Sequence, residues 1–170
     1  VAWTRAGIFF SASQRTWSYL FGLNPATRQI SKHAVREQWI GSSFSLTPDG
    51  ATVAFIGSGP TEFPDVYLAS VPTMAARKIS DTGAQLAAWP THGREVMRWQ
   101  SQDGADIEGV LHKPAGFQPG RRYPLLVVIH GGPTGTDRPA LPDARYYPVD
   151  IWAARGALVQ HVAKFTHGGR

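Results

Sequence analysis

Hydrophobic residues in the first half of the chain fall in short runs that are separated by polar turns. Apolar and aromatic side chains fill residues 7–11 and 17–23, and later residues 52–56 and 66–71. The turns between the runs contain Gly, Pro, Asn or Asp, and Thr47-Pro48-Asp49-Gly50 is the strongest of these signals. Runs of this length, bounded by such turns, predict a series of short β-strands.

The predicted strands repeat weakly along the sequence. Residues 7–10 align with residues 52–55, and residues 29–31 with residues 78–80, at offsets of 45 and 49 residues. Four-stranded propeller blades repeat every ~40–50 residues, so the spacing favours the end of a β-propeller with fewer than two full blades. A closed ring needs ~4–8 blades, which this part of the chain cannot supply. A β-sandwich with evenly spaced turns is the alternative.

The pattern changes after a linker with Pro and Gly at residues 86–93. Residues 96–100 and 107–112 predict a hairpin around the turn signal Asp103-Gly104. Five consecutive apolar residues follow at positions 125–129. Because no polar residue interrupts this run, we expect a strand that is buried on both faces.

A helix and a further strand complete the pattern. Pro148 suits the first position of a helix with its body at residues 149–155, and Gly156 fits the position past its end, where a positive φ is needed. Residues 157–159 begin another apolar strand. The order strand, helix, strand predicts a βαβ unit and a parallel sheet. The expected packing residues of the helix are Val149, Ile151, Trp152 and Ala153.

Composition narrows the possible functions. Of the 170 residues, 42% are hydrophobic, enough for a core, and 17% are charged. The net charge of +5 is spread along the chain without a basic patch, which argues against a nucleic-acid partner. The absence of cysteine excludes disulfides and thiolate sites. No apolar run approaches the ~20 residues of a membrane span. We therefore expect a soluble protein of the cytoplasm or periplasm, and its oligomeric state stays open.

Three segments of the second half carry a family resemblance. They are residues 98–104, residues 107–114, and residues 123–133, which end in His-Gly-Gly-Pro. Over about residues 95–159 the chain resembles the start of the catalytic domain of the prolyl oligopeptidase family of serine peptidases. The closest branch is that of the acylaminoacyl peptidases and dipeptidyl-aminopeptidase-like enzymes.

The resemblance implies a mixed fold, in which the end of a β-propeller precedes the first part of an α/β-hydrolase domain. Residues 1–90 would be the last propeller blades, and residues 91–170 a truncated N-terminal part of the catalytic domain. It also implies hydrolysis of short peptides through an acyl-enzyme, with no cofactor.

By the same resemblance, the loop His130-Gly131-Gly132-Pro133 supplies part of an oxyanion hole. In α/β-hydrolases a loop after the third strand of the fold donates a backbone N–H to the oxyanion. Gly132 is the main candidate donor and Gly131 the second, while His130 shapes the loop. Some relatives carry a tyrosine at this histidine position, so here the oxyanion would depend on backbone donors.

The catalytic triad is absent from the sequence. No Gly-x-Ser-x-Gly motif occurs, and in this fold the serine, acid and histidine follow the oxyanion loop in that order. We expect them downstream of Arg170, so the chain alone would be inactive. After Val159 the sequence departs from the family pattern, and truncation or a frameshift explains the departure. His161 and His167 precede any expected serine and are therefore not assigned as the catalytic base.

Other combinations of residues are weaker indications of a functional site. The six histidines show no metal-binding spacing, so we expect no metal. Asp103, Asp106 and Glu108 are interpreted as residues of a solvated hairpin turn. Two alternatives to the peptidase remain, an esterase fragment of the same fold and a non-catalytic β-rich binding module.

Overall fold

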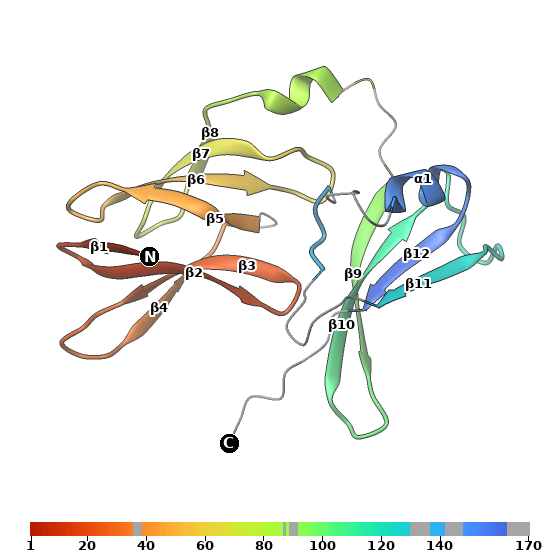
Figure 1. Cartoon of the computed structure of the whole chain (residues 1–170), viewed down its shortest axis with the longest axis horizontal. Coiled ribbons are helices and arrows are strands. Elements are labelled where there is room, and N and C mark those ends of the chain that lie inside the picture. Colours follow the sequence, from red (N-terminus) through yellow and green to blue (C-terminus); the bar gives the residue numbers. More distant parts are fainter. Residues whose placement is uncertain (36–38, 87, 89–91, 130–136, 142–147, 163–170) are drawn as a thin grey trace.

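The described residues of the chain form three four-stranded sheets (Figure 1). The computed structural model describes residues 1–35, 39–86, 88, 92–129, 137–141 and 148–162. Each of the first two sheets is an antiparallel meander with its strands in sequence order. The first consists of β1 (Ala2–Thr4), β2 (Gly7–Gln14), β3 (Trp17–Leu23) and β4 (Ile30–His33). The second consists of β5 (Trp39–Leu46), β6 (Thr52–Ser58), β7 (Asp65–Ser70) and β8 (Ala76–Lys78).

The first two sheets share one hydrophobic core and pack as neighbouring blades. Phe9 and Leu20 of the first sheet join residues of the second sheet in one buried cluster, among them Phe55 and Tyr67. The rings of Phe55 and Tyr67 stack with their centroids 5.6 Å apart. The prediction of fewer than two blades is wrong, because Ala2–Thr4 forms a first strand that is too short to be recognised from its pattern. The described residues form no closed propeller.

The sequence alignment of the two blades is displaced by one residue. An offset of 45 residues pairs Phe10 with Phe55, and both do lie on the second strand of their sheets. The side chain that enters the core from β2 is however Phe9, with 4% of its surface exposed, against 2% for Phe55. Because successive residues of a strand point to opposite faces, a shift of one residue exchanges the two faces.

The third sheet contains the predicted βαβ unit. It is built from β9 (Gly93–Gln100), β10 (Asp106–Lys113), β11 (Leu125–Ile129) and β12 (Leu158–Val162), in the order β11-β12-β10-β9. Strands β11 and β12 are parallel, and helix α1 (Val149–Ala154) lies between them in the sequence. Strands β9 and β10 form the predicted hairpin. A 3₁₀ helix at Thr82–Leu86 precedes the linker.

Strand β11 is not buried on both faces as predicted. It lies at the edge of the sheet and pairs only with β12 among the described strands. Leu125 is 55% exposed and Ile129 75% exposed, whereas Val128 packs in a small core with Val149 and Val159. Of the side chains of this apolar run, Val128 is the one that is buried among the described residues, so the prediction of burial is correct for Val128 alone.

Helix α1 likewise has both buried and exposed apolar side chains. Val149 and Ala153 are buried as predicted, but Ile151 and Trp152 are exposed. A six-residue helix that packs against β12 and β10 presents only one side to the sheet, so two of its four predicted packing residues face outward. Gly156 follows the helix with φ of +88°, as the sequence predicted.

Gly109 of β10 lies where neighbouring atoms leave no room for a Cβ atom. A Cβ atom at this position would lie 2.6 Å from the carbonyl oxygen of His161 and 3.0 Å from the ring of Trp99. We expect Gly109→Ala to lower the free energy of unfolding by about 1–3 kcal/mol, because the backbone of β12 must shift. Urea denaturation measures the loss. Gly93→Ala in the same hairpin is the control, since its Cβ would have only an ordinary contact with Lys113; equal losses in both variants would contradict the steric explanation.

Candidate functional site

The carboxyl ends of the parallel strands meet at one edge of the third sheet. Ile129 pairs with Val162 at the end of β11 and β12, and Val162 also pairs with Gly109 of the antiparallel strand β10. Open α/β sheets place their ligands at this edge. His130, Gly131 and Gly132, the predicted oxyanion-loop residues, follow Ile129 directly in the sequence and lie outside the described residues. Their assigned roles therefore stay predictions.

Glu108 extends from the same edge toward the first blade. Its side chain is 2% exposed, although it lies next to the hairpin turn. Oε2 accepts hydrogen bonds from the backbone N–H of Thr16 at 3.3 Å and from the Thr16 hydroxyl at 3.1 Å. Oε1 accepts from Arg15 Nη1 at 3.2 Å and from Arg98 Nε at 2.8 Å. The predicted solvated turn is thus confirmed for Asp103 and Asp106, which are exposed, and wrong for Glu108.

The surroundings of Glu108 favour its ionised form. Burial alone would raise the pKa of Glu108, but the hydrogen bonds from Thr16, Arg98 and Arg15 outweigh burial and hold the pKa below its ordinary value. A cavity of about 300 Å³ opens beside the carboxylate and is lined also by Trp99. Because Arg15 and Thr16 belong to the β2–β3 turn, Glu108 joins the first blade to the third sheet.

Three buried histidines lie in a row at the third sheet. They come from three separate segments: His92 precedes β9, His112 lies on β10 and His161 on β12. His92 Nε2 lies 3.2 Å from His112 Nδ1, and the ring centroids of His112 and His161 are 5.3 Å apart. No pattern in the sequence indicates this row, because its members are 20 and 49 residues apart and follow no metal-binding motif.

A carboxylate closes each end of the histidine row. Asp150 Oδ1 lies 3.0 Å from His92 Nδ1, and Asp137 Oδ1 lies 2.9 Å from His161 Nδ1. Burial, reinforced by the positive charge of Arg94 and by the neighbouring histidines, lowers the pKa of His112 to about 2. Burial and Arg94 lower the pKa of His92 as well, against the opposing effect of Asp150. His112 and His92 are therefore neutral at pH 7.

Neither cluster is arranged as a metal centre. Among the residues that the structure describes, no group of three or more His, Asp or Glu side chains could hold a metal ion. Across the same residues, no helix is long and apolar enough to cross a membrane.

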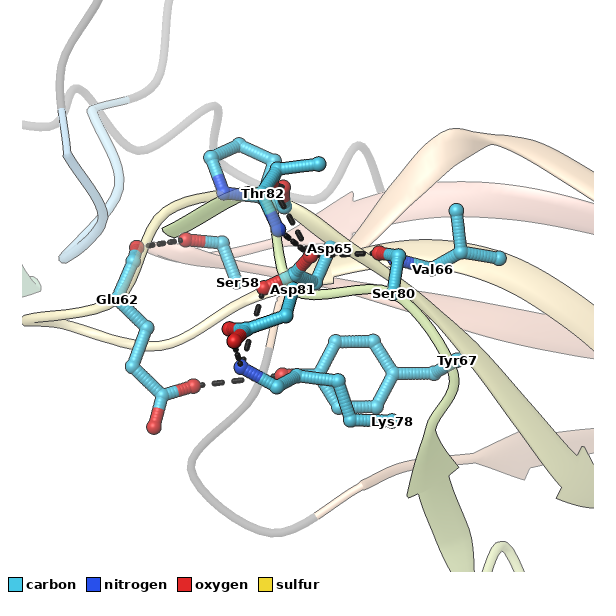
Figure 2. Close-up of polar contacts among 10 residues, drawn as sticks. Ser58, Glu62, Asp65, Val66, Tyr67, Lys78, Ser80, Asp81 and Thr82 are labelled. Atoms are coloured by element: carbon cyan, nitrogen blue, oxygen red, sulfur yellow. Dashed lines mark hydrogen bonds and ion pairs between the residues drawn. The ribbon is translucent and has the colours of Figure 1, made fainter. Parts of the chain in front are cut away.

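A second buried carboxylate, Asp65, ties the end of the second blade together (Figure 2). Its Oδ1 accepts hydrogen bonds from the Ser80 hydroxyl at 2.5 Å and from the backbone N–H and hydroxyl of Thr82 at 2.7 and 3.0 Å. Lys78 Nζ donates to Oδ2 at 3.2 Å. Burial raises the pKa of Asp65, but these donors together lower it far below its ordinary value. With its hydrogen-bonding capacity used in this way, Asp65 is a structural residue.

We expect Asp65→Asn to lower the free energy of unfolding by about 2 kcal/mol, because the amide loses the charge that these donors satisfy and turns an N–H toward Lys78. Chemical denaturation checks this value. Asp81→Asn is the matched control, since Asp81 is largely exposed and its carboxylate pairs with the same ammonium of Lys78 (Figure 2). An equal loss in both variants would show that the buried hydrogen bonds of Asp65 contribute nothing.

Known peptidases share this fold. Acylaminoacyl peptidase of Pyrococcus horikoshii matches 91% of this chain with a TM-score of 0.69 at 19% sequence identity, over 23% of its own length. Dipeptidyl peptidase 4 of Porphyromonas gingivalis matches 91% with a TM-score of 0.66 at 19% identity, over 22% of its length. In sequence, 39 residues are 41% identical to mouse dipeptidyl peptidase 8, which is 23% of this chain and 4% of that protein. No family model matches.

The chain therefore spans less than a quarter of each of these proteins. The solved structures are peptidases of the prolyl oligopeptidase family, which confirms the resemblance predicted from the sequence. They also confirm the mixed fold class, with propeller blades before the first part of a hydrolase sheet.

Proposed function

We propose that this chain is a segment of a serine peptidase of the prolyl oligopeptidase family, with the last propeller blades at residues 1–90 and the first part of the catalytic domain at residues 91–170. The observation that carries the proposal is the βαβ unit of the third sheet. Its strand β11 ends at the carboxyl edge of the sheet, and His-Gly-Gly-Pro follows at once in the sequence. The fold neighbours support the reaction class.

In this proposal the loop supplies fixed hydrogen-bond donors to the transition state. The N–H of Gly132, with that of Gly131 as the second candidate, points at the oxygen of the scissile carbonyl as negative charge develops on it. Glycine lets the backbone approach the substrate closely because it carries no side chain. His130 shapes the loop and takes no proton.

The attacking serine, its histidine base and the acid would lie C-terminal to the loop, in the chain order of the α/β-hydrolase fold. None of these three is assigned within residues 1–170, so this segment alone would not hydrolyse peptides. The exposed edge of β11 supports this assignment. Its apolar side chains, and the backbone groups on the side where no described strand pairs with it, suit pairing with further strands of the same catalytic domain.

Short peptides are the proposed substrates. An acylaminoacyl peptidase that matches this chain with a TM-score of 0.70 has been solved with Z-Gly-Gly-Phe-chloromethyl ketone, a peptide derivative. The 39-residue segment that is similar to dipeptidyl peptidase 8 points to the same class of substrates. We therefore propose release of an acylated residue or of an N-terminal dipeptide, with the propeller limiting access to larger substrates.

The test uses the longest natural polypeptide that contains this chain. Its hydrolysis of an N-acetylated amino-acid anilide, a dipeptidyl anilide and an aryl ester is measured under the same conditions. We expect turnover of at least one anilide. Turnover of the ester alone would make the parent an esterase, and no turnover of any of the three would favour a non-catalytic β-rich module.

A further inference from the structure

The chain has two Asp-Gly pairs, and both lie in turns that read Thr or Ser, any residue, Asp and Gly. One turn is residues 47–50, between β5 and β6, and the other is residues 101–104, at the tip of the β9–β10 hairpin. In both, the glycine N–H donates to the carbonyl oxygen of the first turn residue, at 2.8 Å for Gly50 and 3.0 Å for Gly104. The φ angles of the two glycines, +76° and +81°, are also nearly equal. The two turns therefore offer a matched comparison within one chain.

The two aspartates accept the same hydrogen bonds within their turns. Oδ1 of each aspartate accepts from the hydroxyl of the first turn residue and from the backbone N–H two residues further along the chain. The distance from that nitrogen is 3.0 Å for Asp49 and 3.2 Å for Asp103. Both aspartates are exposed to solvent. The turns thus match in these bonds, and they differ in what surrounds the glycines.

Gly50 is enclosed by the first blade, whereas Gly104 is open. Gly50 is buried, and a Cβ atom at its position would lie 2.8 Å from the Cβ atom of Ala6. The N–H of Arg5 also donates to the carbonyl oxygen of Pro48 at 3.1 Å, so the β1–β2 turn is hydrogen-bonded to this turn. Gly104 is exposed, and no atom of the described residues, apart from its chain neighbours, lies within 4 Å of a Cβ atom placed there. The tip of this hairpin projects beyond the other strands of its sheet (Figure 1).

An aspartate that precedes glycine can form a cyclic imide with its own backbone. The glycine nitrogen attacks Cγ of the protonated carboxyl group, an N–C bond forms, and the carboxyl hydroxyl and the amide proton leave as one water molecule. The five-membered succinimide then takes up one water molecule at either carbonyl group. Opening at the former peptide carbonyl leaves the chain linked through Cγ, as isoaspartate, with no net change in mass. Glycine favours the attack because no side chain shields its nitrogen.

The attack requires local opening of the turn. The glycine nitrogen must leave its hydrogen bond, and the peptide unit between aspartate and glycine must rotate toward the aspartate side chain. At Gly50 this rotation also disrupts the contacts with Ala6 and Arg5 of the first blade. At Gly104 only the turn itself opens. Local opening costs less free energy where fewer contacts outside the segment resist it, so the hairpin tip reaches the reactive geometry more often.

We propose that Asp103 is a site of spontaneous isoaspartate formation in the folded protein, whereas Asp49, in the equivalent turn, is protected by the first blade. The product carries one additional methylene group in the main chain at the tip of the hairpin. This group lies outside the paired residues of β9 and β10, whose pairing ends at Gln100 and Asp106. The hairpin therefore keeps its register, and the modified chain accumulates in the folded state.

The test compares the two turns within one molecule, in the longest natural polypeptide that contains this chain. The protein is incubated at neutral pH and physiological temperature, either folded in buffer or unfolded in urea, and samples are digested at intervals. Liquid chromatography with electron-transfer fragmentation distinguishes isoaspartyl from aspartyl peptides of equal mass. In the folded protein we expect isoaspartate to form at least about tenfold faster at Asp103 than at Asp49. In urea the two rates should be similar, because both aspartates precede glycine.

Asp103→Glu checks the assignment, because the longer side chain would have to close a six-membered ring, which forms much more slowly. This variant should lose nearly all isoaspartate within residues 1–170 of the folded protein, and the matched control Asp49→Glu should lose none. Equal rates at Asp103 and Asp49 in the folded protein, or no isoaspartate at Asp103, would overturn the proposal. An equally strong preference for Asp103 in urea would also overturn it, because the sequence and not the fold would then decide.

Discussion

Replacing Gly132 by proline should lower kcat of the complete peptidase by about 100- to 1,000-fold, the usual loss when one oxyanion-hole donor is removed. Proline has no backbone N–H, so the substitution deletes the donor itself. The change should affect kcat far more than KM, because the donor meets a full negative charge only in the transition state. Steady-state kinetics on the best anilide substrate provides both parameters.

Gly132→Ala separates the hydrogen bond from the shape of the loop. Alanine keeps the N–H and adds only a methyl group, so it should retain far more activity than the proline variant. Equal losses in the two variants would mean that space around the loop matters and the donor does not. A large effect of Gly131→Pro with none of Gly132→Pro would reverse the order of the two candidates.

Glu108→Ala should produce the largest loss of stability at the contact between the first blade and the third sheet. Glu108→Ala removes the acceptor of the Thr16 N–H and hydroxyl and of two guanidinium groups. Thr16 is fully buried and would lose its partner, whereas Arg15 and Arg98 are exposed enough to be solvated. We expect a decrease of about 3 kcal/mol in the free energy of unfolding, measured by urea denaturation at pH 7.

The contribution of Glu108 to the free energy of unfolding should also decrease as the pH falls. Its pKa is lower in the folded chain than in the unfolded chain, so its stabilising effect is fully present above the unfolded value of ~4.3. The effect is lost as the pH falls through the folded value. Asp106→Ala on the same strand is the control, since Asp106 is exposed and its carboxylate accepts a hydrogen bond from Gln100; a loss as large as that of Glu108→Ala would contradict the role of the buried carboxylate.

The sequence predicted what depends on local patterns. Strands β2, β3, β6 and β7 of the two blades, the β9–β10 hairpin, the βαβ unit and the positive φ of Gly156 follow from runs of a few residues and from turn chemistry, and the structure contains all of them. The family resemblance depended on contiguous segments of the same kind, and the fold neighbours agree with it.

What the sequence could not show depends on partners far along the chain. Glu108 is buried because Thr16, 92 positions away, covers it, and a carboxylate beside a turn is otherwise solvated. The histidine row unites His92, His112 and His161 only because β12 pairs with β10 and the segment before β9 folds beside it. For strand β11 the error was the opposite one, since burial was predicted on both faces and most of its side chains are exposed. An apolar run shows what a strand can bury and not what covers it.

The central claim is that residues 130–133 serve a nucleophile that lies elsewhere in the same polypeptide. Labelling with a fluorophosphonate, followed by mass spectrometry to locate the modified residue, tests it most directly. In the longest natural polypeptide that contains this chain, we expect stoichiometric modification of one serine C-terminal to Arg170, and no modification of residues 1–170 expressed alone. A stoichiometrically modified serine within residues 1–170, or no reactive serine in the longer protein, would contradict the claim.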